Sequence, residues 1–311
     1  MADTERILRR LKLSDLRLLQ AVVEWGGMAK AAAHLNISQP AVSKAIATLE
    51  HALGVRLLDR TSRGVVPTEF GDALLSGGTA VFDELKQSLG RIAFLSDPTA
   101  GEVKIGCSEA GAAGFVPAVI DHFARRRPRV TFQVITADPV TLMERELPQR
   151  TVDLAICAIP RVKLRTKVEV TRLFDDRHVV MASKDSKWAR MRKLSLADLT
   201  EEPWVLPPST SEPGKLIAEA FYAVSVMPPQ RLVAAFSIPL CLHLLVTGRY
   251  VAMLPQVMAE LSAYLPLKVL PVTFPAIDRP IGIVTLDGRS IGPLTRQFIE
   301  SAKNVAGTLN Q

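Results

Sequence analysis

The hydrophobic and polar positions of residues 28–53 predict two short helices joined by a tight turn at Asn36-Ile37. Apolar residues recur three and four positions apart, the spacing that places side chains on one face of a helix. They are Ala31, Ala32, Leu35, Ile37, Val42, Ile46 and Leu49. Ser38 can cap the second helix, and Pro40 fits its first turn because no hydrogen bond is lost there. The pattern therefore predicts a helix-turn-helix with a buried seam and an exposed polar face.

A further helix and a small wing are predicted on either side of this motif. Ser14 is expected to cap a helix that runs to about Trp25, where Gly26-Gly27 ends it. Residues 55–67 alternate short apolar groups with arginines, which is typical of a two-stranded wing with a basic tip at Arg63-Gly64. These elements together predict a winged helix-turn-helix.

A long helix is predicted from Thr68, a capping residue, to about Leu95. Apolar residues lie seven apart along it, with others three positions later, which is the pattern of a helix that pairs with another helix. These positions are Leu75, Phe82, Leu85, Leu89 and Ile92. The alternative is a helix that lies on its own domain. Gly77-Gly78 interrupts the pattern and marks either a close helix crossing or a kink.

After a hinge at residues 97–101, strand and helix signals alternate, which predicts a parallel sheet with helices on its faces. Expected strands cover 103–107, 130–135, 154–159, 179–182, 204–206, 232–236, 250–254, 267–270 and 281–285. Expected helices cover 114–126, 140–147, 216–226, 238–247 and 293–305. Two lobes joined by crossovers near 168–172 and 268–271 would enclose a ligand cleft at the carboxyl ends of strands.

The composition narrows the setting in which this fold works. The net charge of +7 and the pI near 9.5 fit a polyanionic partner, although they would also fit a basic enzyme. The charged start of the chain lacks an apolar export segment, and the apolar stretch 238–254 is interrupted by His243, Gly248 and Arg249. We therefore expect a cytoplasmic protein that does not enter a membrane.

The segment from Ala31 to Ser43, AAAHLNISQPAVS, is followed by Leu49-Glu50, Leu53-Gly54, Leu57-Leu58-Asp59-Arg60 and, at 66–71, VPTEFG. It resembles the N-terminal domain of LysR-type transcriptional regulators, densely over residues 12–72 and only in architecture over the rest. Leu58-Asp59-Arg60 stands where the family usually has Phe-x-Arg. The resemblance implies a homodimer, or a homotetramer of two dimers, on a pseudo-palindromic operator in double-stranded DNA. RNA polymerase is a further expected partner.

With this resemblance, the predicted fold is α+β and multidomain. A winged helix-turn-helix occupies 1–68, a linker or dimerisation helix 69–96, a hinge 97–101, and a two-lobed α/β effector-binding domain 102–311. The last resembles type 2 periplasmic binding proteins, with lobe 1 at about 102–168 and 271–311 and lobe 2 at about 169–270. The predicted function is sequence-specific regulation of transcription, controlled by a small molecule in the cleft.

Nine residues are predicted to contact DNA. Gln39 carries a donor and an acceptor that match adenine in the major groove, and an arginine of the wing can enter a narrow minor groove. Lys30 is expected at a phosphate. For Arg60 the alternative is an ion pair with Glu50 or Asp59. The set is Lys30, Ser38, Gln39, Pro40, Ser43, Lys44, Arg56, Arg60 and Arg63.

Side chains at the ends of the predicted strands are candidate effector ligands. Serine at a helix start, beside free backbone N–H groups, can hold a carboxylate or a hydroxyl, and many LysR-type proteins bind small carboxylates at such positions. The candidates are Ser108, Glu109, Thr136, Ile159, Ser209, Phe236 and Ser237. Glu109 is unusual there, because a second carboxylate would repel an anion. It either points away from the cleft or indicates a polyol, sugar or cationic ligand.

No motif predicts catalysis, a metal or a cofactor, so we expect a protein that is not an enzyme. The segment 106–111, GCSEAG, is not the Gly-x-Ser-x-Gly motif of hydrolases, and Walker, dinucleotide-binding and zinc-protease motifs are missing. Cys107, Cys157 and Cys241 are far apart, so buried inert thiols are expected, and only Cys107 with Cys157 could pair across adjacent strands. The alternatives in function are a solute-binding protein and a cleft enzyme fused to a DNA-binding domain.

Overall fold

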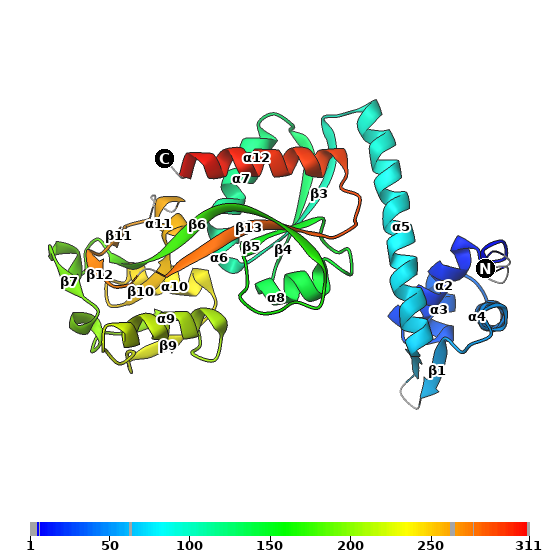
Figure 1. Ribbon diagram of the computed structural model, residues 1–311, viewed down its shortest axis with the longest axis horizontal. Coiled ribbons are helices and arrows are strands. Elements are labelled where there is room, and N and C mark those ends of the chain that lie inside the picture. The colour runs from blue at the N-terminus through cyan, green and yellow to red at the C-terminus, as the bar shows by residue number, and fades with distance from the viewer. Residues whose placement is uncertain (1–4, 6, 62–63, 262–264, 276, 310–311) are drawn as a thin grey trace. The chain divides into compact units, whose positions relative to one another are not determined.

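The computed structural model describes residues 5, 7–61, 64–261, 265–275 and 277–309. It divides into two compact units, the first ending at Gln87 and the second beginning at Ser88. Figure 1 shows the elements of both. Within the described parts of the chain, no helix combines the length and the apolar character needed to cross a membrane. Each unit has a core of its own.

The first unit contains a helix-turn-helix. Its helices are α2 (Leu13–Glu24), α3 (Met28–Leu35) and α4 (Gln39–Leu53), and α5 (Glu69–Ser96) begins in this unit. Most of the predicted apolar seam forms its core, where α3 and α4 pack with α2. The buried seam residues are Ala31, Ala32, Val42, Ile46 and Leu49. Ile37, which was predicted to join them, is exposed in the turn.

The ends of these helices follow local sequence signals with one exception. Asn36 has a φ of 57° and ends α3, and Gly54 has a φ of 72° and ends α4, as left-handed residues commonly do. The prediction that Ser14 caps the first helix is wrong, because Ser14 lies inside α2 and Lys12 is the N-cap. The carboxylate of Asp15 accepts a hydrogen bond from the Lys12 N–H at 3.0 Å, which fixes the start one turn earlier.

The predicted wing consists of β1 (Leu58–Thr61) and β2 (Gly64–Pro67), which pair antiparallel. Glu50 joins the wing to α4, because its Oε1 accepts hydrogen bonds from the N–H groups of Leu57 at 2.8 Å and Leu58 at 3.2 Å. Thr68 Oγ1 accepts from the Gly71 N–H at 3.1 Å, so it caps α5 as predicted.

The second unit is built on a twisted sheet with the strand order β4-β3-β5-β13-β6-β10-β8-β9, and β11 pairs with β6. The pairs β3–β4, β3–β5, β8–β9 and β8–β10 are parallel, as the alternating pattern predicted. The strands are β3 (Ala100–Cys107), β4 (Arg129–Thr136), β5 (Leu154–Ala158), β6 (Val168–Ser183), β8 (Trp204–Leu206), β9 (Leu232–Ala234), β10 (Val251–Pro255), β11 (Leu267–Val269) and β13 (Asp278–Leu286). A separate parallel pair consists of β7 (Leu194–Ser195) and β12 (Val272–Thr273).

Two long antiparallel strands, β6 and β13, connect the lobes (Figure 1). β6 begins at the predicted first crossing but continues to Ser183, where it pairs with lobe 2 strands. The return crossing was predicted at 268–271, yet β11 pairs with the end of β6 and Ile277 packs in the lobe 2 core. The chain returns in β13 instead, so lobe 2 extends to about residue 277 rather than 270.

Helices cover this sheet, and several begin directly after a strand. They are α6 (Glu109–Ala113), α7 (Phe115–Ala124), α8 (Pro139–Thr141), α9 (Glu212–Ala223), α10 (Ile238–Val246), α11 (Gln256–Leu261) and α12 (Pro293–Leu309), with the short turns η1 (Leu142–Glu146), η2 (Lys187–Arg190) and η3 (Ala197–Leu199). The helix expected at 140–147 is α8 followed by the π-helical turn η1. Because β3, β4, β8 and β9 are followed closely by α6, α8, α9 and α10, the starts of these helices meet at one edge of the sheet.

Candidate functional site

The first candidate site is the exposed face of α4 and its surroundings. Ser38 Oγ accepts a hydrogen bond from the Ala41 N–H at 3.4 Å, which holds the start of the helix. Of the predicted base contacts, Ser38, Gln39, Pro40 and Lys44 are exposed and Ser43 is half-buried. An exposed amide and ammonium in the first two turns can reach base edges and phosphates when the helix enters a major groove.

The other predicted DNA contacts lie around this helix. Lys30 on α3 and Arg56 just before β1 are exposed. Arg63 lies outside the described residues, as does the side chain of Arg60. One alternative for Arg60 was an ion pair with Glu50, whose Oε1 is occupied by two backbone N–H groups of the wing.

The predicted dimerisation positions on α5 fall into two groups. Leu75 is half-buried and packs against the core of the first unit, in line with the alternative that this helix lies on its own domain. Phe82 is half-buried as well, with the Arg17 guanidinium 5.8 Å from its ring centre. Further along, exposed apolar residues form a continuous line that we call the α5 stripe. It comprises Val81, Leu85, Leu89, Ile92 and Leu95.

The second candidate site is a cavity of about 710 Å³ in the second unit. Five of the seven predicted effector residues line it, namely Ser108, Glu109, Thr136, Phe236 and Ser237. Ile159 and Ser209 are not among the residues that line it. The Ile159 N–H bonds the Pro280 carbonyl beside β13, and Ser211 lines the cavity where Ser209 was expected. Most of the wall is apolar and aromatic, which is typical of a site for a small organic ligand.

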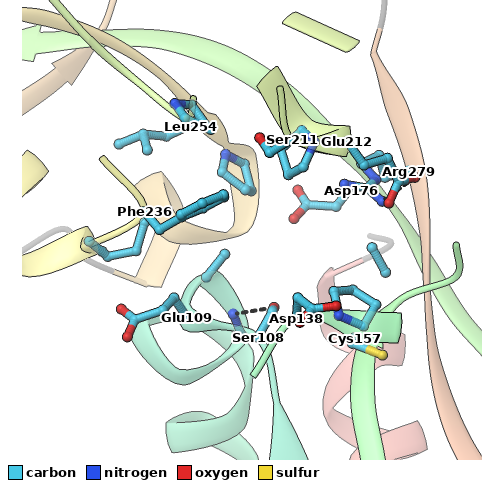
Figure 2. A pocket seen from close by; sticks show the side chains of 18 of the residues that line it. Ser108, Glu109, Asp138, Cys157, Asp176, Ser211, Glu212, Phe236, Leu254 and Arg279 are labelled. Atoms are coloured by element: carbon cyan, nitrogen blue, oxygen red, sulfur yellow. Dashed lines mark hydrogen bonds and ion pairs between the residues drawn. The ribbon is translucent and has the colours of Figure 1, made fainter. Parts of the chain in front are cut away.

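One wall carries a buried arginine that we did not predict. Arg279 Nη2 donates to Glu212 Oε1 at 3.1 Å, and only 11% of the arginine side chain is exposed. The register of β13 and β6 places Arg279 opposite Asp176, whose Oδ1 accepts from the Val257 N–H at 3.2 Å. Figure 2 shows Arg279, Asp176 and Glu212 together on one side of the cavity. A planar guanidinium held between carboxylates is an oriented donor for a polar group of a ligand.

His178 adds a neutral imidazole to this wall. Burial lowers its pKa from 6.5 to about 4, although the hydrogen bond with the Ile277 carbonyl opposes the shift, and the nearby Arg279 charge adds to it. Nδ1 lies 3.3 Å from that carbonyl oxygen, so the neutral ring donates from Nδ1. Nε2 is therefore an acceptor at neutral pH.

Helix starts supply the remaining polar groups. Ser108, Ser211 and Ser237 are the N-caps of α6, α9 and α10, where each Oγ accepts a backbone N–H. The Ser211 hydroxyl also donates to the Pro208 carbonyl at 2.6 Å, whereas the Ser108 hydroxyl has no acceptor among the residues described. Ser108 can therefore donate to a ligand while it caps its helix.

Two carboxylates near Ser108 have different surroundings. Asp138 caps α8 by accepting from the Thr141 N–H at 3.0 Å, and although burial opposes its ionisation, hydrogen bonds from Thr141 hold its pKa below the usual range. Glu109 is exposed, and Figure 2 shows its carboxylate turned away from Ser108 and Asp138. This orientation fits the alternative in which Glu109 points away from the ligand.

The three cysteines are buried and free. Burial raises the pKa of the Cys107 thiol to about 11, with a further contribution from the Glu109 charge, and burial raises the pKa of Cys157 and Cys241 to about 12. Thiols of this kind stay protonated and react slowly at neutral pH. Over the described stretches of the chain, no group of histidine, cysteine and acidic residues is arranged to hold a metal ion.

Sequence reasoning missed Asp138, Ser211 and Arg279. The first two carried a usable signal, because Asp138-Pro139 and Ser211-Glu212-Pro213 each place a capping residue before a proline at the start of a helix. Arg279 had no such signal. Its place in the cavity follows from strand pairing with residues about a hundred positions earlier.

A capped helix-turn-helix with a wing, followed by a two-lobed α/β unit with a ligand-sized cavity, defines a ligand-responsive DNA-binding regulator. Residues 13–72 match the model of the bacterial regulatory helix-turn-helix protein of the lysR family, and residues 96–307 match the LysR substrate binding domain. The chain belongs to the LysR family of transcriptional regulators.

Curated relatives and solved structures agree with this family. The chain is 27% identical over 301 residues to the HTH-type transcriptional regulator GbpR of Azospirillum brasilense, covering 96% of this chain and 88% of that protein. It resembles full-length OxyR from Pseudomonas aeruginosa (TM-score 0.66, 21% identity, 95% and 94% coverage). It also resembles full-length LysG from Corynebacterium glutamicum with bound effector arginine (TM-score 0.64, 21% identity, 94% and 99% coverage). These two structures support the shared fold.

Proposed function

We propose that this LysR-type regulator reads a pseudo-palindromic operator as a homodimer joined through the α5 stripe. The observation that carries this proposal is the exposed start of α4, with Gln39 and Lys44 on a helix whose other face is buried. Two such helices on one dimer would read two half-sites a turn of DNA apart. Pairs of dimers and a contact with RNA polymerase would complete the regulatory assembly.

The effector is proposed to be a small, mainly apolar molecule with one polar group directed at Arg279 and His178. The apolar wall favours such a ligand, and the arginine, the neutral imidazole and the Ser108 hydroxyl are donors and acceptors that can orient it. An acidic group on the ligand would compete with Glu212 for Arg279. That exchange would alter contacts between α9 and β13, and hence the relative stability of open and closed lobes.

We further infer that the protein works in the cytoplasm and has no catalytic activity of its own. Its relatives are named as transcriptional regulators. The cavity combines Ser108 with no histidine in hydrogen-bond contact, and the thiols of Cys107 and Cys157 are protonated at neutral pH, so a nucleophile is not activated there.

Two measurements on the full-length protein test these proposals. Binding to its own promoter DNA should weaken steeply with salt and be lost in competition with unlabelled operator before random DNA, whereas a solute-binding protein would show neither behaviour. A thermal-shift screen of metabolites should then find ligands that raise the melting temperature. Ser108→Ala should reduce this ligand response without changing DNA affinity, and equal responses of the two proteins would contradict the ligand role of Ser108.

A further inference from the structure

A second concave site lies between α7 and α12, on helices that pack side by side in the second unit (Figure 1). It has a volume of about 370 Å³ and shares no lining residue with the effector cavity. We call it the arginine groove, and define it by His122, Arg126, Arg127, Arg296, Gln297 and Ser301. A water molecule occupies roughly 30 Å³, so one ordered water cannot fill this space.

The groove contains two buried polar atoms without a hydrogen-bond partner. They are Gln297 Oε1 and Ser301 Oγ, which lie one turn apart on α12. Ser301 is only 8% exposed, and every buried hydroxyl or amide oxygen left unpaired costs stability. In the described chain these are the only buried side-chain atoms of this kind, and both line the same groove.

The charge of the groove is strongly positive. Arg126 and Arg296 are exposed and make no ion pair with the residues described, and Arg127 stacks on the Phe123 ring at 4.8 Å. The one carboxylate at the rim, Glu300, is paired with Lys303 at 2.7 Å. Three guanidinium groups therefore face a groove without a carboxylate free to neutralise them. Guanidinium groups bind phosphate oxygens through paired hydrogen bonds.

From these features we infer that the arginine groove binds a small phosphate monoester that also carries a hydroxyl group. The phosphate dianion would answer the arginines and accept from Ser301 Oγ. Gln297 Oε1 is an acceptor and needs a donor, which a phosphate dianion lacks and a neighbouring hydroxyl supplies. A concave site with buried polar atoms favours a small ligand over the flat backbone of DNA or an acidic protein surface. The inference does not depend on the operator or the effector proposed above.

The test is calorimetric titration of the full-length protein with glycerol 3-phosphate, at constant ionic strength and without DNA. Saturable binding should be stronger than that of inorganic phosphate or sulfate. Arg126→Gln and Arg296→Gln should each weaken it about tenfold or more, because a charged hydrogen bond is lost. Arg125→Gln is the matched control: Arg125 is the neighbouring arginine, is paired with Asp121 at 2.7 Å and does not line the groove. Its affinity should equal that of the parent protein.

Two further variants separate a ligand role from a structural one. Ser301→Ala should leave the melting temperature of the free protein unchanged or raise it, since an unpaired buried hydroxyl is removed, while the phosphate ester binds more weakly. Gln297→Leu should keep binding of inorganic phosphate and lose the preference for glycerol 3-phosphate.

Four results would overturn the inference. Equal effects of phosphate, sulfate and the ester would indicate an adventitious ion only. Loss of binding in Arg279→Gln would place the probe in the effector cavity. Unchanged affinity in Arg126→Gln and Arg296→Gln would remove the groove from the site. Binding of a polyglutamate peptide or of DNA through these arginines, without binding of the ester, would show a macromolecular contact instead.

Discussion

Replacing Leu89 by glutamate is expected to break the homodimer. Leu89 is 67% exposed, and it lies in the middle of the α5 stripe between Leu85 and Ile92, which is 61% exposed. Full burial of a leucine contributes about 1.5–3 kcal/mol, so burying the exposed two thirds contributes about 1–2 kcal/mol in each protomer, or about 2–4 kcal/mol in a symmetric pair. The dimer dissociation constant should therefore rise by about 30-fold to 1,000-fold.

Sedimentation velocity over a concentration series measures this change directly. The matched control is Gln87→Glu, which adds the same charge to the same helix away from the stripe. The control should sediment as the parent protein does, and Leu89→Glu should sediment as a monomer at concentrations where the parent is dimeric. Equal sedimentation of Leu89→Glu and the parent would refute the proposal that the stripe joins the two protomers.

Three further predictions follow from the two sites. Gln39→Ala should lose about 1–3 kcal/mol of discrimination at one base position, whereas Lys30→Ala should weaken all DNA sequences alike; anisotropy titrations on substituted operators measure both. Because burial lowers the His178 pKa from 6.5 to about 4, the unfolded chain takes up a proton first as the pH falls. The parent protein should lose about 3 kcal/mol of stability between pH 6.5 and pH 4 relative to His178→Asn in urea titrations, and parallel curves would contradict this. The buried thiols, with pKa values of about 11 to 12, should react with iodoacetamide at pH 7.5 only after urea is added, and rapid labelling of the folded protein would contradict their assignment as inert.

The helix-turn-helix could be predicted well because its signals are local. Left-handed Asn36, the cap at Ser38 and the glycine at position 54 act on residues within a few positions, and the apolar spacing sets the buried face. Ser14 shows the limit of such signals. Two neighbouring residues competed for the start of α2, and the hydrogen bond between Asp15 and the Lys12 N–H decided it.

The cavity could be predicted only in part, for a physical reason. Ser108 and Ser237 lie directly after strands, so the topology of a parallel sheet brings them to one edge. Arg279 reaches the same place because the long strand β13 pairs with β6, and that register depends on packing along the whole sheet. The same long-range pairing moved the return crossing from 268–271 to β13.

Selection of bound DNA from a random library by the full-length protein tests the central claim most directly. The account predicts enrichment of an inverted repeat with two half-sites about one helical turn apart, and weaker preference at one base of each half-site when Gln39→Ala is used. A pool with no enriched sequence, or one enriched identically by the Gln39→Ala variant, would contradict the assignment of α4 as the element that reads the operator.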